Sequence, residues 1–241
     1  MPTADEIKAA AEESKIFLGT FDPNTVGSWY GLTDPVHCYH DLNRIPHLLV
    51  AGRTGAGKSV LLRNYLAAAD LAPEAYKVIH ITTEPDTGRT TKTFTIEEAS
   101  RALDMVVRAL DGREKKLAQA GLFDWKDLRR ADNDNEAHTL LVIVDGLERT
   151  LGDPGRYSYD DGRAPHKALT DIMRRGRSLG VHLIATTQRD TPGGWTSWEQ
   201  KLPPFATTLA FTPRGCGRAV WYEGREAASP EFSVNAPGLD Q

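Results

Sequence analysis

The stretch Gly52-Arg53-Thr54-Gly55-Ala56-Gly57-Lys58-Ser59 decides the fold that this sequence predicts. It fits the pattern G-x-x-x-x-G-K-[ST], in which a glycine-rich loop curls around phosphate groups. Residues 47–51 before the loop are largely apolar, as in a buried strand, and residues 60–66 after it have helical spacing. This order directs backbone N–H groups and the positive end of a helix at a phosphate. The chain is therefore expected to bind a nucleoside triphosphate, or to descend from a protein that did.

Two residues of this loop carry the expected chemistry. Lys58 would reach the β- and γ-phosphates, and the hydroxyl group of Ser59 would hold Mg²⁺. The predicted ligands are therefore ATP and Mg²⁺. The predicted nucleotide-binding residues are Gly52, Thr54, Gly55, Ala56, Gly57, Lys58, Ser59 and Val60.

The composition is that of a soluble globular chain of ordinary domain size, with 241 residues, 40% of them hydrophobic and 26% charged. A net charge of −4 argues against a wholly basic nucleic-acid binder, although a few inward loops could still contact DNA. Cys38 and Cys216 match no metal or redox spacing, as expected in a reducing compartment. No apolar run approaches the ~20 residues that cross a bilayer. We expect a cytoplasmic protein that would reach a membrane only through a membrane-bound partner.

Strand and helix patterns alternate from residue 47 onward, which predicts an α/β fold with a mainly parallel central sheet and helices on both faces. The expected strands are 48–51, 76–82, 140–144, 182–186 and 207–212, and the expected helices are 58–69, 96–120 and 164–179. Residues 1–40 are expected to form an N-terminal helix (3–16) and an antiparallel cover. Residues 41–228 form the main domain, and residues 229–241 an irregular tail or one docked on a neighbour.

The apolar run 140–144 ends at Asp145, which would meet the Mg²⁺ shell through water. Asp145 could instead cap the next helix. Many ATPases of this type carry glutamate directly after this aspartate, whereas this chain has Gly146. Glu148 is the alternative catalytic carboxylate, or else a surface charge. Weak hydrolysis is therefore an open alternative.

A second polar group follows the strand at 182–186. Gln188 falls at the same sheet edge as Asp145, where its amide could sense the γ-phosphate or help to position water. Arg177 lies before that strand, near a helix end, and is expected at a subunit border. Its alternative is solvated surface charge.

Two patches resemble the RecA-like motor domain of the FtsK/SpoIIIE family of double-stranded DNA translocases. The first is Asp41-Leu42-Asn43-Arg44-Ile45-Pro46-His47-Leu48-Leu49-Val50-Ala51-Gly52, which leads into the phosphate-binding loop. The second runs from Gly176-Arg177 through Gly180-Val181-His182-Leu183-Ile184 to Ala185-Thr186-Thr187-Gln188-Arg189. The resemblance extends over roughly residues 41 to 222.

The resemblance implies an ATP-dependent homo-oligomer, usually a hexameric ring, that threads double-stranded DNA for transfer, segregation or packaging. It implies that Lys58 and Ser59 bind phosphate and magnesium, that Asp145 supports the metal, and that Gln188 senses the nucleotide. Thr208 falls where the chromosome pumps carry an arginine, which leaves Arg218 or Arg177 as the arginine that acts on a neighbouring subunit.

Two other functions remain open. The first is a degenerate nucleotide-binding module, or a secretion-type ATPase domain with a polypeptide client, in which ATP is a structural or regulatory ligand. The second is an unrelated enzyme such as a small-molecule kinase, although the patch at 180–189 has no role there.

Overall fold

The computed structural model describes residues 2–21, 36–83, 91–131, 137–151, 165–188, 207–212, 217–223, 226–229 and 231–235. It confirms the predicted α/β class. The chain divides into two compact units. Unit 1 comprises residues 1–72, 186–194 and 205–241, and unit 2 comprises residues 73–185 and 195–204.

Unit 1 contains the phosphate-binding loop and strands from both ends of the chain. Its strands lie in the order β2-β1-β11-β9-β8-β3, and β10 pairs with β9. Among these strands, as far as the structure describes them, β3 pairs with β8 in parallel, and the β1–β2, β1–β11, β9–β11, β8–β9 and β9–β10 ladders are antiparallel. Its elements are α1 (Ala4–Glu12), β1 (Lys15–Phe21), β2 (Val36–Asp41), β3 (Leu48–Ala51), α3 (Lys58–Leu71), β8 (Thr207–Phe211), β9 (Arg218–Glu223), β10 (Glu226–Ala227) and β11 (Phe232–Val234).

The N-terminal helix begins where its sequence dictates. Thr3 caps α1, because its side chain accepts a hydrogen bond from the Glu6 N–H while the Glu6 carboxylate accepts one from the Thr3 N–H. Ile7 and Ala11 are buried on the face that packs toward β1 and α3. The helix expected over residues 3–16 ends instead at Glu12, because the chain turns at residues 13–14 and enters β1 at Lys15. Strands β1 and β2 pair antiparallel, and α1 lies against α3, the helix that follows the loop.

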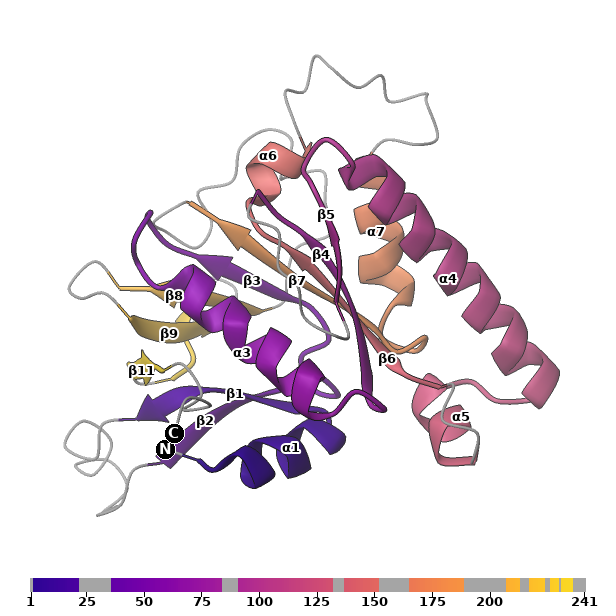
Figure 1. Cartoon of the computed structure of the whole chain (residues 1–241), viewed down its shortest axis with the longest axis horizontal. Helices are drawn as coiled ribbons and strands as arrows, with labels where there is room; N and C mark the ends of the chain where they lie inside the picture. The colour runs from indigo at the N-terminus through magenta and orange to yellow at the C-terminus, as the bar shows by residue number, and fades with distance from the viewer. Residues whose placement is uncertain are drawn as a thin grey trace. The chain divides into compact units, whose positions relative to one another are not determined.

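Unit 2 is built on parallel strands in the order β7-β6-β4-β5. Strand β6 is buried along its whole length, as its apolar run predicts for a parallel sheet covered on both faces. Helices α4 and α7 lie side by side in this unit (Figure 1). Its elements are β4 (Tyr76–Ile81), β5 (Thr91–Phe94), α4 (Ala99–Ala120), α5 (Trp125–Ala131), β6 (Thr139–Val144), α6 (Leu147–Leu151), α7 (Pro165–Arg175) and β7 (Val181–Thr187), whose last two residues belong to unit 1.

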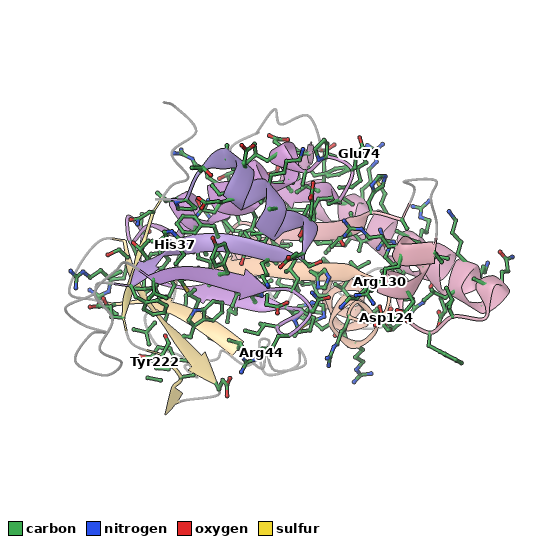
Figure 2. The ribbon with its side chains drawn as sticks, turned by 90° about the horizontal axis from the view of Figure 1, so that it is seen from below. His37, Arg44, Glu74, Asp124, Arg130 and Tyr222 are labelled. Carbon is green, nitrogen blue, oxygen red and sulfur yellow. The ribbon has the colours of Figure 1, made fainter. Side chains whose placement is uncertain are left out.

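A half-buried arginine fixes the turn that leads into β7. The guanidinium group of Arg113 donates to the carbonyl groups of Leu179 (2.7 Å), Gly180 (2.8 Å) and His138 (2.8 Å), and lies 4.3 Å from the centre of the Trp125 ring. Burial lowers the pKa of Arg113 to about 10. Figure 2 shows Asp124 and Arg130 at the α5 end of the same unit. Arg113 thus fixes the turn before β7.

The structure differs from the sequence-based expectation in several elements. The tail is not wholly irregular, because Phe232–Val234 forms β11 between β1 and β9. Helix α7 ends at Arg175 because residues 176–180 turn into β7, and α4 begins at Ala99 because a turn occupies residues 96–98. Strands β5, β9 and β10 and helices α5 and α6 were not predicted because they are short and lack a long periodic pattern.

Within the residues that the structure describes, no helix is both long and apolar enough to span a membrane. Cys38 is buried, and Cys216 lies outside the described residues.

Candidate nucleotide-binding site

The loop after β3 has the backbone geometry that its glycines predict. Gly55 has φ +78° and Gly57 has φ +115°, and both values lie in the left-handed region that side chains disfavour. Gly57 is also the N-cap of α3, a helix of 14 residues. The first turn of a helix leaves its N–H groups without intrahelical acceptors, so this end of α3 can bind an anion.

The side chains of the loop lie where a solvent-borne ligand can reach them. Thr54, Gly55 and Ser59 are exposed, and Ala56, Gly57, Lys58 and Val60 are half-buried, whereas Gly52 is buried at the end of β3. The Lys58 ammonium group donates to the carbonyl oxygens of Gly52 (2.6 Å) and Arg53 (2.8 Å). The loop thus holds its own cation directly over the turn that the motif assigns to phosphate.

Two residues that the sequence did not single out form the back of the loop. A side chain at Gly57 would meet the Phe211 ring at 2.9 Å and Gly217 at 3.3 Å, and one at Gly52 would meet the Phe211 Cβ at 2.9 Å. The Gly217 N–H also donates to the Ala56 carbonyl (2.8 Å). Glycine is therefore required at positions 52 and 57 for close packing against Phe211 and Gly217. No local signal marks either partner, because both lie some 150 residues further along the chain.

Gln188 lies in unit 1 together with the phosphate-binding loop. It follows the last residue of β7, Thr187, whose carbonyl accepts a hydrogen bond from the Gly52 N–H (3.2 Å). Gln188 itself is exposed. The ends of β3 and β7 are therefore hydrogen-bonded to each other at Gly52 and Thr187, directly before Gln188. The role of Gln188 stays a prediction.

Asp145, Gly146 and Glu148 lie in unit 2, at the end of β6. Asp145 is half-buried, and its N–H donates to the Ile81 carbonyl (2.8 Å) at the end of β4. Gly146 has φ +90°, and its carbonyl accepts hydrogen bonds from the N–H groups of Arg149 and Thr150 (both 3.1 Å). Glu148 is half-buried in the first turn of α6. Gly146 thus starts α6 in a conformation that glycine adopts readily and other residues do not.

The candidate arginines occupy different positions. Arg218 is exposed at the start of β9 and pairs with Glu231 (3.1 Å), whose other oxygen accepts a hydrogen bond from the Thr212 hydroxyl (2.6 Å). Arg218 directly follows Gly217, whose N–H donates a hydrogen bond to the Ala56 carbonyl of the phosphate-binding loop in the same chain. Arg177 is exposed in the turn before β7, at the opposite end of that strand from Gln188. Thr208 is buried in β8 and has no chemical likeness to an arginine.

The donor set fits a nucleotide with magnesium. Among the described residues no three His, Cys, Asp or Glu side chains form a group that could hold a metal by themselves. A Mg²⁺ ion bound with a nucleotide takes most of its ligands from phosphates and water, and needs only one or two from the protein. The exposed Ser59 hydroxyl at the start of α3 has the chemistry to supply such a ligand.

Comparison with known proteins points to one family. The sequence pattern of the FtsK/SpoIIIE family matches residues 32–192. The DNA translocase FtsK of Leptospira interrogans is 28% identical over 167 residues, which are 62% of this chain and 17% of that protein. The DNA translocase SpoIIIE of Bacillus subtilis is 28% identical over 169 residues, which are 62% of this chain and 21% of that protein. The chain thus spans about a fifth of the length of these relatives.

Solved structures share the fold at lower sequence identity. The pCW3 conjugation coupling protein TcpA, in its monomer form with ATPγS, has a TM-score of 0.68 and 17% identity, over 93% of this chain and 66% of that one. ATPases 2 and 3 of EccC from Thermomonospora curvata, in complex with a signal sequence peptide, have a TM-score of 0.70 and 19% identity, over 95% of this chain and 44% of that one. At these identities the likeness establishes the fold.

Proposed function

Because the chain belongs to the FtsK/SpoIIIE family, we propose that it is the ATP-binding motor domain of a double-stranded DNA translocase. In this proposal like subunits assemble into a ring, six in the usual case, and move duplex DNA in transfer, segregation or packaging. The observation that carries the proposal is the match over residues 32–192, which includes a phosphate-binding loop with the required backbone geometry.

The loop residues would bind the nucleotide by exchanging partners. Lys58 would release the carbonyl groups of Gly52 and Arg53 and donate to the β- and γ-phosphates instead. The N–H groups of residues 57–60, at the N-terminus of α3, would donate to the same phosphates. Mg²⁺ would supply charge neutralisation at the phosphate oxygens. Ser59 would hold that ion, and Asp145 would support it through water.

The remaining site residues act by orientation in this proposal. Gln188 would sense the γ-phosphate or hold the attacking water, because amide groups can do both in phosphoryl transfer. Glu148 is the candidate general base, since Gly146 has no side chain to serve. Arg177 and Arg218 are the candidates for the arginine that reaches a neighbouring subunit. Arg218 would first have to leave Glu231.

The proposal is tested by ATP hydrolysis in the presence of duplex DNA. We expect a basal rate that rises several-fold when long duplex DNA is added, and loss of both rates in the Lys58→Ala variant. The Lys8→Ala variant, in which an exposed lysine of α1 is removed, should behave as the wild type. A protein that neither hydrolyses ATP nor binds duplex DNA at low salt would contradict the motor function.

The glycine at position 146 favours a second candidate function, because it has no carboxylate to activate water. Its left-handed φ is one that other residues adopt less readily. In that case the chain is a degenerate module that holds ATP as a structural or regulatory ligand, or a secretion-type ATPase domain with a polypeptide client. ATP would then raise the melting temperature by mass action without turnover. Thermal unfolding with ATP, measured beside the hydrolysis assay, separates this candidate from the motor.

A further inference from the structure

A buried asparagine joins α3, the helix that follows the phosphate-binding loop, to strand β1 and to the residue after β11. Asn64 of α3 is 2% exposed. Its side-chain amide donates to the Leu18 carbonyl of β1 (3.2 Å) and to the Asn235 carbonyl just after β11 (2.9 Å). The other atom of the amide, Oδ1, is buried without a hydrogen-bond partner within the part of the chain that the structure describes.

The strand that Asn64 reaches also contacts the loop itself. The Val234 N–H of β11 donates to the Gly217 carbonyl (2.6 Å), and the Gly217 N–H donates to the Ala56 carbonyl of the loop (2.8 Å). Asn235 is held in turn, because its N–H donates to the Leu18 carbonyl (3.3 Å) and its side chain donates to the Thr20 hydroxyl (2.8 Å). Strand β11 is therefore bonded through one neighbour to the loop and through another to α3.

This closed path of hydrogen bonds would be expensive if it served stability alone. A buried amide loses its hydration, and here one of its polar atoms regains no partner. An apolar side chain of similar size would spare the desolvation of the amide, at the expense of the hydrogen bonds to the Leu18 and Asn235 carbonyls. The amide can instead fix the position of α3 along its axis, because its two N–H donors bind carbonyl groups of β1 and of the residue after β11.

From this path we infer that Asn64 is a positioning residue for nucleotide binding. It acts by holding α3 against β11, which is in turn hydrogen-bonded through Gly217 to the loop. The inference rests on the proposed function of the loop. In that function the N-terminus of α3 would supply N–H groups to the phosphates, and the Ala56 N–H closes a turn of the loop by donating to the Arg53 carbonyl (3.2 Å). Because phosphate binding depends on the placement of both, releasing α3 from β11 weakens nucleotide binding even though Asn64 lies away from the loop.

The first test replaces the amide by an apolar group of similar size. Asn64→Leu should remain folded and should bind a fluorescent ATP analogue about tenfold more weakly than the wild type. The turnover rate of the saturated enzyme should change less than its KM. Asn43→Leu is the matched control, because the exposed Asn43 amide bonds only weakly to the Glu13 carbonyl (3.4 Å). Unchanged affinity in a folded Asn64→Leu protein would overturn the inference.

Two further variants keep the test decisive if Asn64→Leu fails to fold. Asn64→Asp removes the donors while the carboxylate is ionised, but its protonated form can donate one O–H. Because burial at position 64 should raise the pKa of the new carboxyl group, the affinity deficit relative to the wild type should be large at pH 8 and smaller at pH 5.5. Asn235→Ala loosens only the Thr20 contact and should weaken binding by a smaller factor.

These outcomes separate the inference from the proposed function. If the wild type binds no ATP analogue, the proposed function fails. If the wild type binds it and the folded variants at positions 64 and 235 bind equally well at every pH, the proposed function stands and the positioning role is refuted.

Discussion

Gly146 directly follows Asp145, at the position where the resemblance to the FtsK/SpoIIIE family predicts a glutamate. With φ at +90°, the residue allows the chain to leave β6 and enter α6 at once. The space beside it is open, since a Cβ would first meet the Arg149 side chain at 3.8 Å. A glutamate at position 146 would therefore have space for its side chain but would be strained by the positive φ of the backbone.

Substitution at this position should cost stability without restoring catalysis. Gly146→Ala and Gly146→Glu are each expected to lower the free energy of unfolding by about 1–2 kcal/mol, because L residues are strained at positive φ. Neither should raise the ATPase rate. Gly112→Ala is the matched control: it lies within α4, where an added Cβ meets nothing within 4 Å, so we expect it to stabilise by about 0.5–1 kcal/mol. Urea unfolding and hydrolysis assays check both, and a faster Gly146→Glu enzyme would contradict this account.

His40 makes the stability of unit 1 depend on pH. It is fully buried: one ring nitrogen donates to the Ile45 carbonyl (2.7 Å), so the other accepts from the Tyr65 hydroxyl (2.6 Å) and the ring is neutral. Burial lowers the pKa of His40 to about 4, against the opposing effects of the Ile45 hydrogen bond and the Asp41 charge. His47 is a smaller influence in the same direction as burial.

The unfolded chain therefore binds this proton more tightly than the folded chain. The contribution of His40 is complete above pH ~6.5 and is lost as the pH falls to about 4, by up to about 3 kcal/mol. In urea unfolding from pH 7.5 to 4, the wild type should lose that much more stability than the His40→Gln variant. Parallel pH profiles for the two proteins would refute the assignment.

At the scale of elements, the three-residue strand β11 links two parts of the sheet of unit 1, because it pairs with β1 on one side and with β9 on the other. Phe232 and Val234 are buried while Ser233 between them is only half-buried, so the strand shows the alternation of a strand with one face toward the core. Its place against β1 depends on Gly19, because a side chain there would overlap the Ser233 carbonyl. The antiparallel part of unit 1 is thus completed by the end of the chain.

Truncating the core residue of this strand tests whether the tail is structural. Phe232 is 1% exposed and lies against the rings of Trp221 and Phe21. Phe232→Ala should therefore lower the free energy of unfolding by about 3–5 kcal/mol. Phe123→Ala, at a phenylalanine that is 91% exposed, should change it by less than about 0.5 kcal/mol. Equal, small effects in thermal unfolding would mean that the tail is as irregular as its sequence suggests.

At the scale of the whole molecule, a net charge of −4 limits how the chain can contact DNA. Contacts must come from local groups of arginine and lysine, so they should be few, independent of DNA sequence and sensitive to salt. The chain also spans about a fifth of the length of its curated relatives, so the activities of those longer proteins do not transfer as a whole.

Salt should therefore separate DNA binding from nucleotide binding. If about three phosphates are contacted, raising the salt from 50 to 200 mM should weaken duplex binding by ~40-fold. The affinity for ATP should change far less, since in the proposed function α3 and Lys58 would hold the phosphates at close range. Fluorescence titrations with duplex DNA and with an ATP analogue measure both. Duplex binding that survives this change in salt would contradict a phosphate-based contact.

The sequence by itself determined the features whose causes lie within a few consecutive residues. The capping box at Thr3, the strand–loop–helix unit around Gly52–Ser59 and the buried run that ends at Asp145 are all of this kind. Propensity, capping and periodicity act over one or two turns, so a single segment carries the whole signal. The family resemblance rests on the same local segments.

Only the tertiary structure decided which distant residues support the loop. Phe211 and Gly217 form its back, Asn64 binds both ends of the chain, and Arg113 fixes the turn before β7. Each looks like an ordinary strand or helix residue in sequence, because its partner lies tens to more than a hundred residues away. The left-handed φ of Gly146 belongs here too, since a glycine permits that conformation without requiring it. Long-range packing selects one arrangement among many that the local sequence allows, and for this reason the support of the site had to be seen in the fold.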